Sequence, residues 1–257
     1  MKLHMKLATV LGCLAIFGMP GLTLAQQNVV VPNAFANVPG DTNNGFPFNL
    51  GSFTSSTQRY QQVYASNQFS AISVPTFISA ISFRVATDGS GSAFSSTLPS
   101  IQINLSTTSA TPSSLSSTYS DNIGGNDAQV YSGALTLSST NTGSPPNFDI
   151  TITLQTPFLY DPVSGNLLMD VRNFGGGSTT QFDAINSDPS VERVWNNDVT
   201  SPTGSVDGLG LITQFTFTAV PEPTTWALIG VGSLGTGVYA WRKKQLSIKA
   251  GMAKLKK

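Results

Sequence analysis

The sequence between residues 26 and 219 predicts an all-β fold, an antiparallel β-sandwich of jelly-roll type. Apolar and polar residues alternate over short runs in this region, as they do in strands that bury one face and leave the other in water. Clusters of Gly, Pro, Asn, Asp and Ser separate the runs, which is typical of turns between strands. No stretch has the 3.6-residue apolar period of an amphipathic helix. Nine or ten short strands of this kind indicate a sandwich or a jelly roll.

The strand boundaries follow from runs in which every second residue is apolar. In the clearest run, Phe148–Leu154, the Phe, Ile and Leu side chains should face the core, and Thr151 and Thr153 should face water. Ile101–Leu105 alternates in the same way. The other expected strands are Asn28–Val31, Tyr60–Ala65, Ile81–Val85, Val130–Leu137, Leu167–Arg172, Gln181–Ile185, Val191–Trp195 and Leu211–Phe217. The expected turns are Asp88–Gly91, Asn122–Asn126, Gly143–Pro146 and Gly175–Gly177.

Charge is distributed unevenly along the 257 residues. Residues 26–220 contain four Arg, no Lys and twelve Asp or Glu, which gives a net charge of −8. Residues 221–257 carry a net charge of +6, and Lys2 and Lys6 supply the other two positive charges. Positive charge beside apolar segments is typical of membrane-targeting signals. The acidic middle region has no basic patch, so we expect no nucleic-acid partner.

The first 25 residues have the pattern of a secretion signal peptide. Two lysines precede an apolar segment, Leu7–Leu24, which contains a Pro-Gly break. Thr23 and Ala25 place small residues at the −3 and −1 positions, so we expect signal peptidase to cleave after Ala25. The alternative is a permanent N-terminal membrane helix, which the break and the cleavage site disfavour.

Cleavage there would leave a domain without cysteine or histidine. Cys13 and His4 are the only residues of their types in the chain, and both lie in the signal. The remaining domain therefore cannot form a disulfide. It also cannot build a zinc site from Cys or His ligands, or a Ser-His-Asp or Cys-His catalytic site. We expect no enzyme activity, no metal and no cofactor.

A glycine-rich apolar segment near the C-terminus has two interpretations. The stretch Gly230–Gly235 has the G-x-G-x-x-G spacing of a dinucleotide-binding loop. Such a loop requires an acidic residue about 20 positions later, and no Asp or Glu follows Glu222. A single transmembrane helix over residues 223–241 fits better, because this uncharged segment is long enough to span a bilayer. The basic residues that should hold its end in the cytoplasm are Arg242, Lys243 and Lys244.

The order of features in this tail resembles the PEP-CTERM protein-sorting domain. A Val-Pro-Glu-Pro motif precedes the Gly-rich apolar span and the basic cluster, and the resemblance covers residues 220–244. It implies recognition by an exosortase, a membrane-embedded cysteine protease-transpeptidase that would cut at or near the motif. Residues 245–257 would form a basic cytoplasmic tail, and the alternative for the whole tail is a simple single-pass anchor. The motif residues are Val220, Pro221, Glu222 and Pro223.

Two polar patterns inside the domain each have a structural and a functional interpretation. Ser106–Ser120 is rich in Ser and Thr, which predicts a long flexible loop or, alternatively, an O-glycosylated segment that adheres to polysaccharide. The pairs Thr151/Thr153 and Thr216/Thr218 have the spacing of an ice-binding threonine face. Threonine is also common on any exposed strand, and the absence of a repeat favours that simpler interpretation.

Acidic side chains gather in the sequence around Trp195. Two carboxylates could serve a glycosidase, and several could bind calcium. The calcium-loop spacing is absent, however, and Glu192 is the only glutamate between residues 26 and 219, so solvated loop carboxylates are favoured. The four acidic residues are Asp183, Asp188, Glu192 and Asp198.

Aromatic side chains are the last candidate ligand contacts. Trp195, Tyr60 and Tyr64 could form a platform on which a sugar stacks, or they could be buried in the core. We therefore expect an exported, non-catalytic protein of the bacterial surface or extracellular matrix, associated with exopolysaccharide. The alternatives are a carbohydrate-binding module and, less favoured, a glycan hydrolase or an ice-binding protein. The expected route passes through the inner membrane to the cell surface or matrix.

Overall fold

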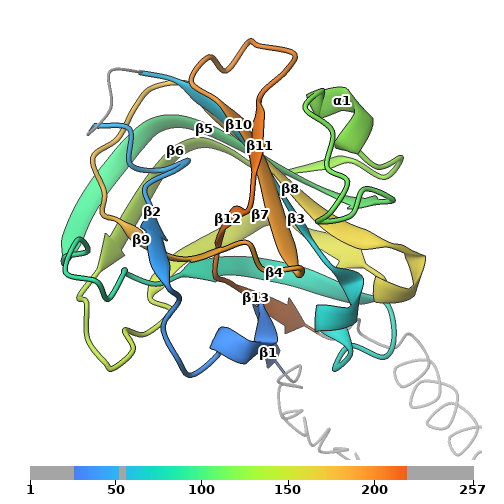
Figure 1. The fold of residues 1–257 in the computed structure, drawn as a ribbon, viewed down its shortest axis with the longest axis horizontal. Helices are drawn as coiled ribbons and strands as arrows, with labels where there is room; N and C mark the ends of the chain where they lie inside the picture. The colour runs from blue at the N-terminus through green and yellow to red at the C-terminus, as the bar shows by residue number, and fades with distance from the viewer. Residues whose placement is uncertain (1–25, 52–55, 219–257) are drawn as a thin grey trace, which may run out of the picture.

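The computed structural model describes residues 26–51 and 56–218, which form strands with very little helix (Figure 1). The predicted signal peptide (1–25), sorting motif with its span, and basic tail lie outside these residues. No helix within the described part is long and apolar enough to cross a membrane. The longer strands are β1 (Gln26–Val31), β3 (Gln58–Tyr64), β4 (Thr76–Phe83), β5 (Phe94–Thr108), β6 (Ala128–Ser139), β7 (Ile150–Tyr160), β8 (Asn166–Asn173), β9 (Phe182–Asn186), β10 (Val191–Asn196) and β13 (Thr213–Thr218). Three-residue strands are β2 (Thr42–Asn44), β11 (Ser205–Asp207) and β12 (Leu209–Leu211), and the helical turns are η1 (Asn33–Phe35), η2 (Ser66–Phe69), α1 (Tyr119–Asn122) and η3 (Pro162–Ser164).

The strands form three sheets in which the named strands pair antiparallel. One sheet has the order β1-β13-β4-β7, and a larger one has the order β11-β10-β3-β8-β5-β6. Eight strands of these two sheets, β1, β3, β4, β5, β6, β7, β8 and β13, follow the pairing order of a jelly roll. The remaining strands form the small sheet β12-β9-β2 and extend the larger sheet beyond β3. The all-β, antiparallel sandwich is therefore confirmed.

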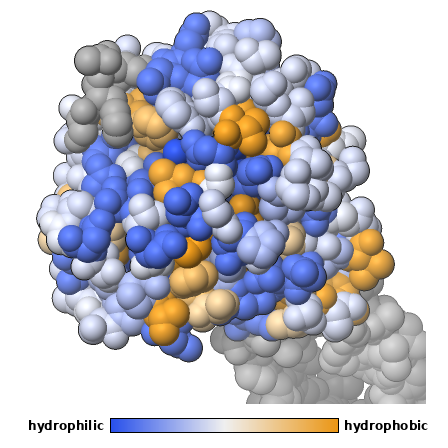
Figure 2. Space-filling view, viewed as in Figure 1, coloured by the Kyte–Doolittle hydropathy of each residue, from blue (hydrophilic) through white to orange (hydrophobic). Residues whose placement is uncertain are grey.

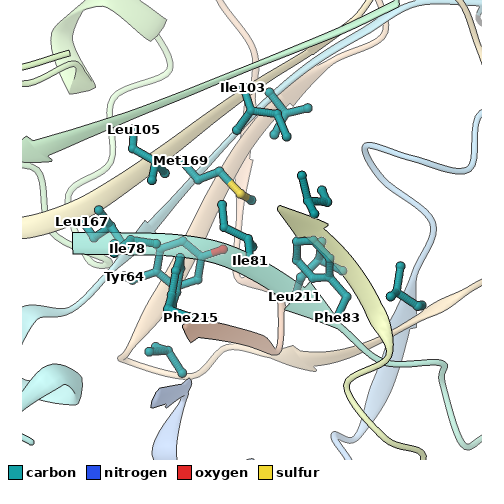
Figure 3. Packing of buried hydrophobic residues seen from close by; sticks show 14 of the residues in the cluster. Tyr64, Ile78, Ile81, Phe83, Ile103, Leu105, Leu167, Met169, Leu211 and Phe215 are labelled. Atoms are coloured by element: carbon teal, nitrogen blue, oxygen red, sulfur yellow. The ribbon is translucent and has the colours of Figure 1, made fainter. Parts of the chain in front are cut away.

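The core lies between the two larger sheets. The Tyr64 ring on β3 meets the Phe215 ring on β13 edge-on, with 4.9 Å between the ring centroids. Figure 3 shows Met169 from the six-stranded sheet near Ile81 from the four-stranded sheet. All four side chains are buried, and aromatic pairs of this geometry add to the stability that area burial provides.

All ten expected strands are present, most of them longer than predicted. The alternation in β7 is confirmed, because Ile150 and Ile152 are buried and Thr151 and Thr153 are exposed. The run Leu211–Phe217 is divided between β12 and β13, which lie in different sheets. The strands β2 and β11 were not predicted, because three residues are too few to show an alternating pattern.

The Ser/Thr-rich segment 106–120 is not a plain loop. Its first residues complete β5, and its end enters helix α1. Leu115 and Tyr119 are buried in a small apolar cluster with Val63, Leu168 and Val194, which come from β3, β8 and β10. Residues 109–118 form a loop, as predicted, but this loop is packed on the outer face of the six-stranded sheet instead of extending freely into water.

Hydrogen bonds fix the same segment to the sheet. Gln61 Nε2 donates to the Tyr119 carbonyl oxygen at 3.2 Å and to Asp170 Oδ2 at 3.0 Å. The Asn122 side-chain amide, just after the segment, donates to Gln61 Oε1 at 3.1 Å. Arg59 completes the network with two hydrogen bonds to Asp170, of which the shorter is 2.7 Å. Buried polar groups that all have partners specify one arrangement of the chain, so this network determines how the segment lies on the sheet.

A buried ion pair joins the small sheet to the sandwich. Arg84 follows β4, Asp183 lies on β9, and Arg84 Nε is 2.7 Å from Asp183 Oδ2 with each side chain 1 % exposed. The guanidinium also donates to the carbonyl oxygens of Phe35 and Val38, and the Gly40 amide donates to Asp183 Oδ1 at 3.0 Å. Burial raises the pKa of Asp183, while Arg84 and the Gly40 amide oppose that rise. The pair therefore anchors the segment between η1 and β2.

We expect Arg84→Met to destabilise the protein by about 3–5 kcal/mol, because it leaves a buried carboxylate without its cation. The double variant Arg84→Met/Asp183→Asn should lose less, since the neutral amide can still accept from the Gly40 amide. Arg172→Met is the control, because Arg172 is 31 % exposed and 3.8 Å from Asp170, and it should change stability by about 0–1 kcal/mol. Urea unfolding measures all three variants, and an equal loss for Arg84→Met and Arg172→Met would contradict the assignment.

Candidate functional site

Of the three aromatic residues considered as a sugar platform or as core residues, two lie inside the core. Trp195 on β10 lies directly opposite Tyr60 on β3, and both strands belong to the six-stranded sheet. Tyr60 and Tyr64 are 0 % exposed, so neither ring can stack on a glycan, and this part of the prediction is corrected. The physical reason is the period of the strand, which places residues 60 and 64 on the same, inward face. Burial raises the pKa of the Tyr60 hydroxyl, which keeps it protonated.

Trp195 sits at the rim of this cluster and is half-buried. Its ring lies against Phe46, with 4.9 Å between the centroids. Its indole N–H donates to Asp207 Oδ2 at 2.8 Å. Both the ring and the indole N–H of Trp195 thus have partners within the protein, so its side chain mainly contributes to the packing of the domain.

Arg193 and Asp207 complete the surroundings of Trp195. Arg193 Nε donates to Asp207 Oδ1 at 2.6 Å, and Nη2 donates to Asp207 Oδ2 at 3.1 Å. The guanidinium carbon is 5.6 Å from the Trp195 ring centroid, within the range of a cation–π contact. The sequence alone did not single out Asp207, because a three-residue strand on the edge of a sheet gives no periodic signal.

Asp207 has a carboxyl group whose ionised form is favoured in the fold. Burial opposes ionisation, but hydrogen bonds from Arg193, Trp195 and the Leu209 amide hold the pKa of Asp207 below its ordinary value. The charged form is thus part of the folded cluster rather than a proton donor.

The four acidic residues singled out from the sequence serve separate structural roles. Asp183 is paired with Arg84, and Glu192 Oε2 accepts from the Leu115 amide at 3.2 Å. Asp188 and Asp198 each accept from a backbone amide two residues later, in turns. No group of three or more Asp, Glu, His or Cys residues that could hold a metal ion occurs in residues 26–51 and 56–218.

The two threonine pairs lie on the outer face of the same four-stranded sheet. Thr216 and Thr153 both pair with Ala80 on β4, one from each side, and opposite residues in a sheet share a face. Thr216 Oγ1 donates to Asn28 Oδ1 at 2.9 Å, and the Thr151 and Ser82 hydroxyls are hydrogen-bonded at 2.9 Å. These hydroxyls are partly engaged with neighbouring side chains and form no regular repeat.

Few aromatic rings reach the surface of the described domain. Among its large apolar side chains that are clearly exposed, Phe174 is the aromatic one, at 44 %. A hollow of about 460 Å³ beside the Gly143–Pro146 turn is lined by Arg84 and Phe148, among others. The Arg84 guanidinium, however, is already hydrogen-bonded to Asp183 and to two backbone carbonyl oxygens. The described domain thus offers no surface with two exposed aromatic rings.

The predicted processing sites adjoin the two ends of the described chain. Gln26, the residue after the expected signal cleavage at Ala25, begins β1, and Thr218, two residues before Val220, ends β13. The two strands pair along their whole length, with Gln26 opposite Thr218. The structure thus brings together the chain positions from which the signal peptide and the sorting tail depart, although the processing residues themselves lie outside the described part.

We expect the stability of the protein to fall as the pH drops below about 4, in part because Asp207 then becomes protonated. Because the pKa of Asp207 is lower in the folded state than its ordinary value, its ionised carboxylate stabilises the fold at pH values above that ordinary pKa. This stabilisation is lost as the pH falls through the pKa of the folded state. Asp207→Asn should therefore flatten the dependence of the urea midpoint on pH between about 5 and 3. Trp195→Phe, which removes one donor, should flatten it less. Parallel curves for wild type and Asp207→Asn would rule out this role.

Comparison with known proteins finds a match at the C-terminus. No curated protein matches the chain. The pattern that describes the PEP-CTERM protein-sorting motif matches residues 219–244. This range contains the Val-Pro-Glu-Pro motif, the Gly-rich span and the basic cluster on which the sequence interpretation rested. The motif implies export, processing by an exosortase and sorting to the surface. The chain therefore carries a PEP-CTERM protein-sorting motif in its C-terminal tail.

Proposed function

We propose that the protein is an exported, non-catalytic component of the bacterial surface or extracellular matrix that an exosortase delivers and that associates with exopolysaccharide. The observation that carries this proposal is the sorting motif, which begins directly after the last strand of the sandwich. A folded domain followed at once by such a motif is suited to be cargo of the sorting route.

The proposed route has an ordered set of segments. Signal peptidase removes residues 1–25 after Ala25, and the span 223–241 then holds the precursor in the inner membrane. The cluster Arg242–Lys244 and the tail 245–257 stay in the cytoplasm, since basic residues favour that side. The exosortase cuts at or near Pro221–Pro223. Prolines restrict the backbone to extended conformations, which suits a protease cleft.

A matrix role is supported by the surface of the domain. Figure 2 shows a face on which polar residues predominate and apolar ones are scattered in small groups. Residues 26–220 contain no lysine and have a net charge of −8, which favours solubility and disfavours binding to other acidic polymers. Association with exopolysaccharide would then depend on neutral hydroxyl and amide groups, which are abundant in this chain.

The alternative, a carbohydrate-binding module, has less support. Such modules stack sugars on exposed rings, whereas here Tyr60 and Tyr64 are buried and Trp195 is half-buried and hydrogen-bonded. A glycan hydrolase has less support again, because each candidate carboxylate already has a structural partner.

Replacing Pro221, Glu222 and Pro223 by Ala should leave several times more of the protein in the membrane fraction, because the exosortase no longer recognises its site. Cell fractionation with immunoblotting measures this retention. Pro202→Ala is the control, because Pro202 is an exposed proline in the loop between β10 and β11, away from the motif and from strands β1, β4, β7 and β13. Unchanged release of the triple variant would show that the motif does not direct sorting.

Retention in the extracellular matrix should be unchanged in Trp195→Phe, because the Trp195 ring and N–H are engaged within the domain. Matrix extraction followed by quantitative immunoblotting tests this expectation. A selective loss of retention, with the urea midpoint close to that of wild type, would instead support a carbohydrate-binding module centred on Trp195.

A further inference from the structure

Both ends of the described chain leave from one end of the four-stranded sheet. Gln26 pairs with Thr218, Thr218 pairs with Phe77, and Phe77 pairs with Leu159. This row of four residues therefore crosses all four strands, with neighbouring strands about 4.8 Å apart. Figure 1 shows β1 and β13 side by side along the lower side of the domain.

Exposed aliphatic side chains flank the same row. Leu159, in the row itself, is 47 % exposed. Val74, just before β4, is 63 % exposed, and Val163, in η3 just after β7, is 92 % exposed. Since β4 begins and β7 ends at this end of the sheet, with Thr76 opposite Tyr160, the three residues lie at the same end of the sheet. We call Val74, Leu159 and Val163 the aliphatic rim.

The aliphatic rim is almost free of charge. The four strands of this sheet contain no Asp, Glu, Lys or Arg, and neither do residues 65–75. Asp161 is the one charged residue in the turn between β7 and β8, and its carboxylate accepts from the Val163 amide at 3.1 Å and from the Ser164 hydroxyl at 2.9 Å. In a domain with a net charge of −8, a neutral end is a distinct feature, and it is compatible with contact with lipid head groups.

The length of the chain places this end close to the membrane. The proposed span begins at Pro223, only five residues after Thr218. A fully extended chain covers at most about 3.4 Å per residue, so Thr218 lies within about 17 Å of the start of the span. No other end of the sandwich is tied so closely, because β13 is the last strand before the span.

We propose that the aliphatic rim rests on the outer surface of the lipid bilayer while the precursor is anchored, with Val74, Leu159 and Val163 in the interfacial region. The inference rests on the proposed membrane span. Side chains of this kind enter the interface readily, but three of them bind weakly without an anchor. The contact therefore needs both the rim and the tether, and it is released when the exosortase cuts the tail.

The test places a fluorophore on the rim of the anchored precursor, residues 26–257. This chain contains no cysteine, so Val163→Cys allows a single label at a site that is 92 % exposed. Val38→Cys is the matched control, because Val38 is also exposed, at 49 %, and lies near Arg84 at the opposite end of β4. The protein is reconstituted into vesicles of phosphatidylethanolamine and phosphatidylglycerol that contain a nitroxide-labelled lipid as quencher.

We expect the label at residue 163 to be quenched several-fold more strongly than the label at residue 38. Val74→Ser/Leu159→Ser, added to the Val163→Cys chain, should reduce that difference, because the rim and not only the tether holds the contact. Equal quenching at residues 163 and 38, or quenching that the serine variants leave unchanged, would overturn the proposal while the anchor stands. A shift in emission that depends on protein density and not on the quencher would also overturn it, since it would indicate pairing between copies.

Vesicle flotation separates this proposal from the one on which it rests. If the precursor of residues 26–257, which lacks the signal peptide, fails to float with the vesicles, the membrane span itself is wrong and the rim proposal falls with it. If the chain floats and only the quenching result is negative, the span is retained and the rim proposal alone is rejected.

Discussion

The pairing of the first strand with the last is the interaction on which the arrangement of the domain depends. Strand β1 forms six antiparallel residue pairs with β13, and β13 in turn pairs with β4. The four-stranded sheet is therefore incomplete until the chain has been exported as far as Thr218. Contacts between residues so far apart in sequence are slow to form, because closing a long loop costs conformational entropy before it brings any contact.

The core and the buried ion pair add to the stability that this strand pairing provides. Phe215 and Phe217 on β13 fill the space beside Phe69, with ring centroids 5.5 and 6.0 Å away. The Arg84–Asp183 pair joins the small sheet to the sandwich. A domain without disulfides depends on such packing and buried polar contacts for its stability. The satellite cluster around Tyr119 adds a third layer on the outside of the six-stranded sheet.

The sequence predicted both the position of a strand and the direction of its side chains wherever one face of that strand is buried and the other is exposed to water. Strand β7 is such a case, and its alternation predicted both the strand and its orientation. Strand β3 is the opposite case, because its inner face carries Tyr60 and Tyr64 while the Tyr119 segment covers Val63 on its outer face. A strand that is buried on both faces loses its alternating pattern. The Ser/Thr-rich composition of 106–120 likewise concealed two anchoring residues, Leu115 and Tyr119.

The candidate site was only partly accessible to sequence reasoning, for a different physical reason. Trp195 was singled out as an aromatic residue near carboxylates, but its actual partner, Asp207, comes from an edge strand twelve residues later. That pairing is a matter of register between β10 and β11, which local composition does not encode. The sorting motif, by contrast, is a linear signal whose order of residues can be recognised without knowledge of the fold.

The fold and the linear signal meet at Thr218. Strand β13 pairs with β1 up to this residue, and the Val-Pro-Glu-Pro motif begins at Val220, so little chain separates the folded domain from the proposed cutting site. A protease that needs an extended segment must then approach the end of the four-stranded sheet closely, or the last pairs of β13 must open. Terminal strand pairs open more easily than central ones. Under the proposed processing route, the stability of the β1–β13 pair would therefore couple the completion of folding to the release of the domain.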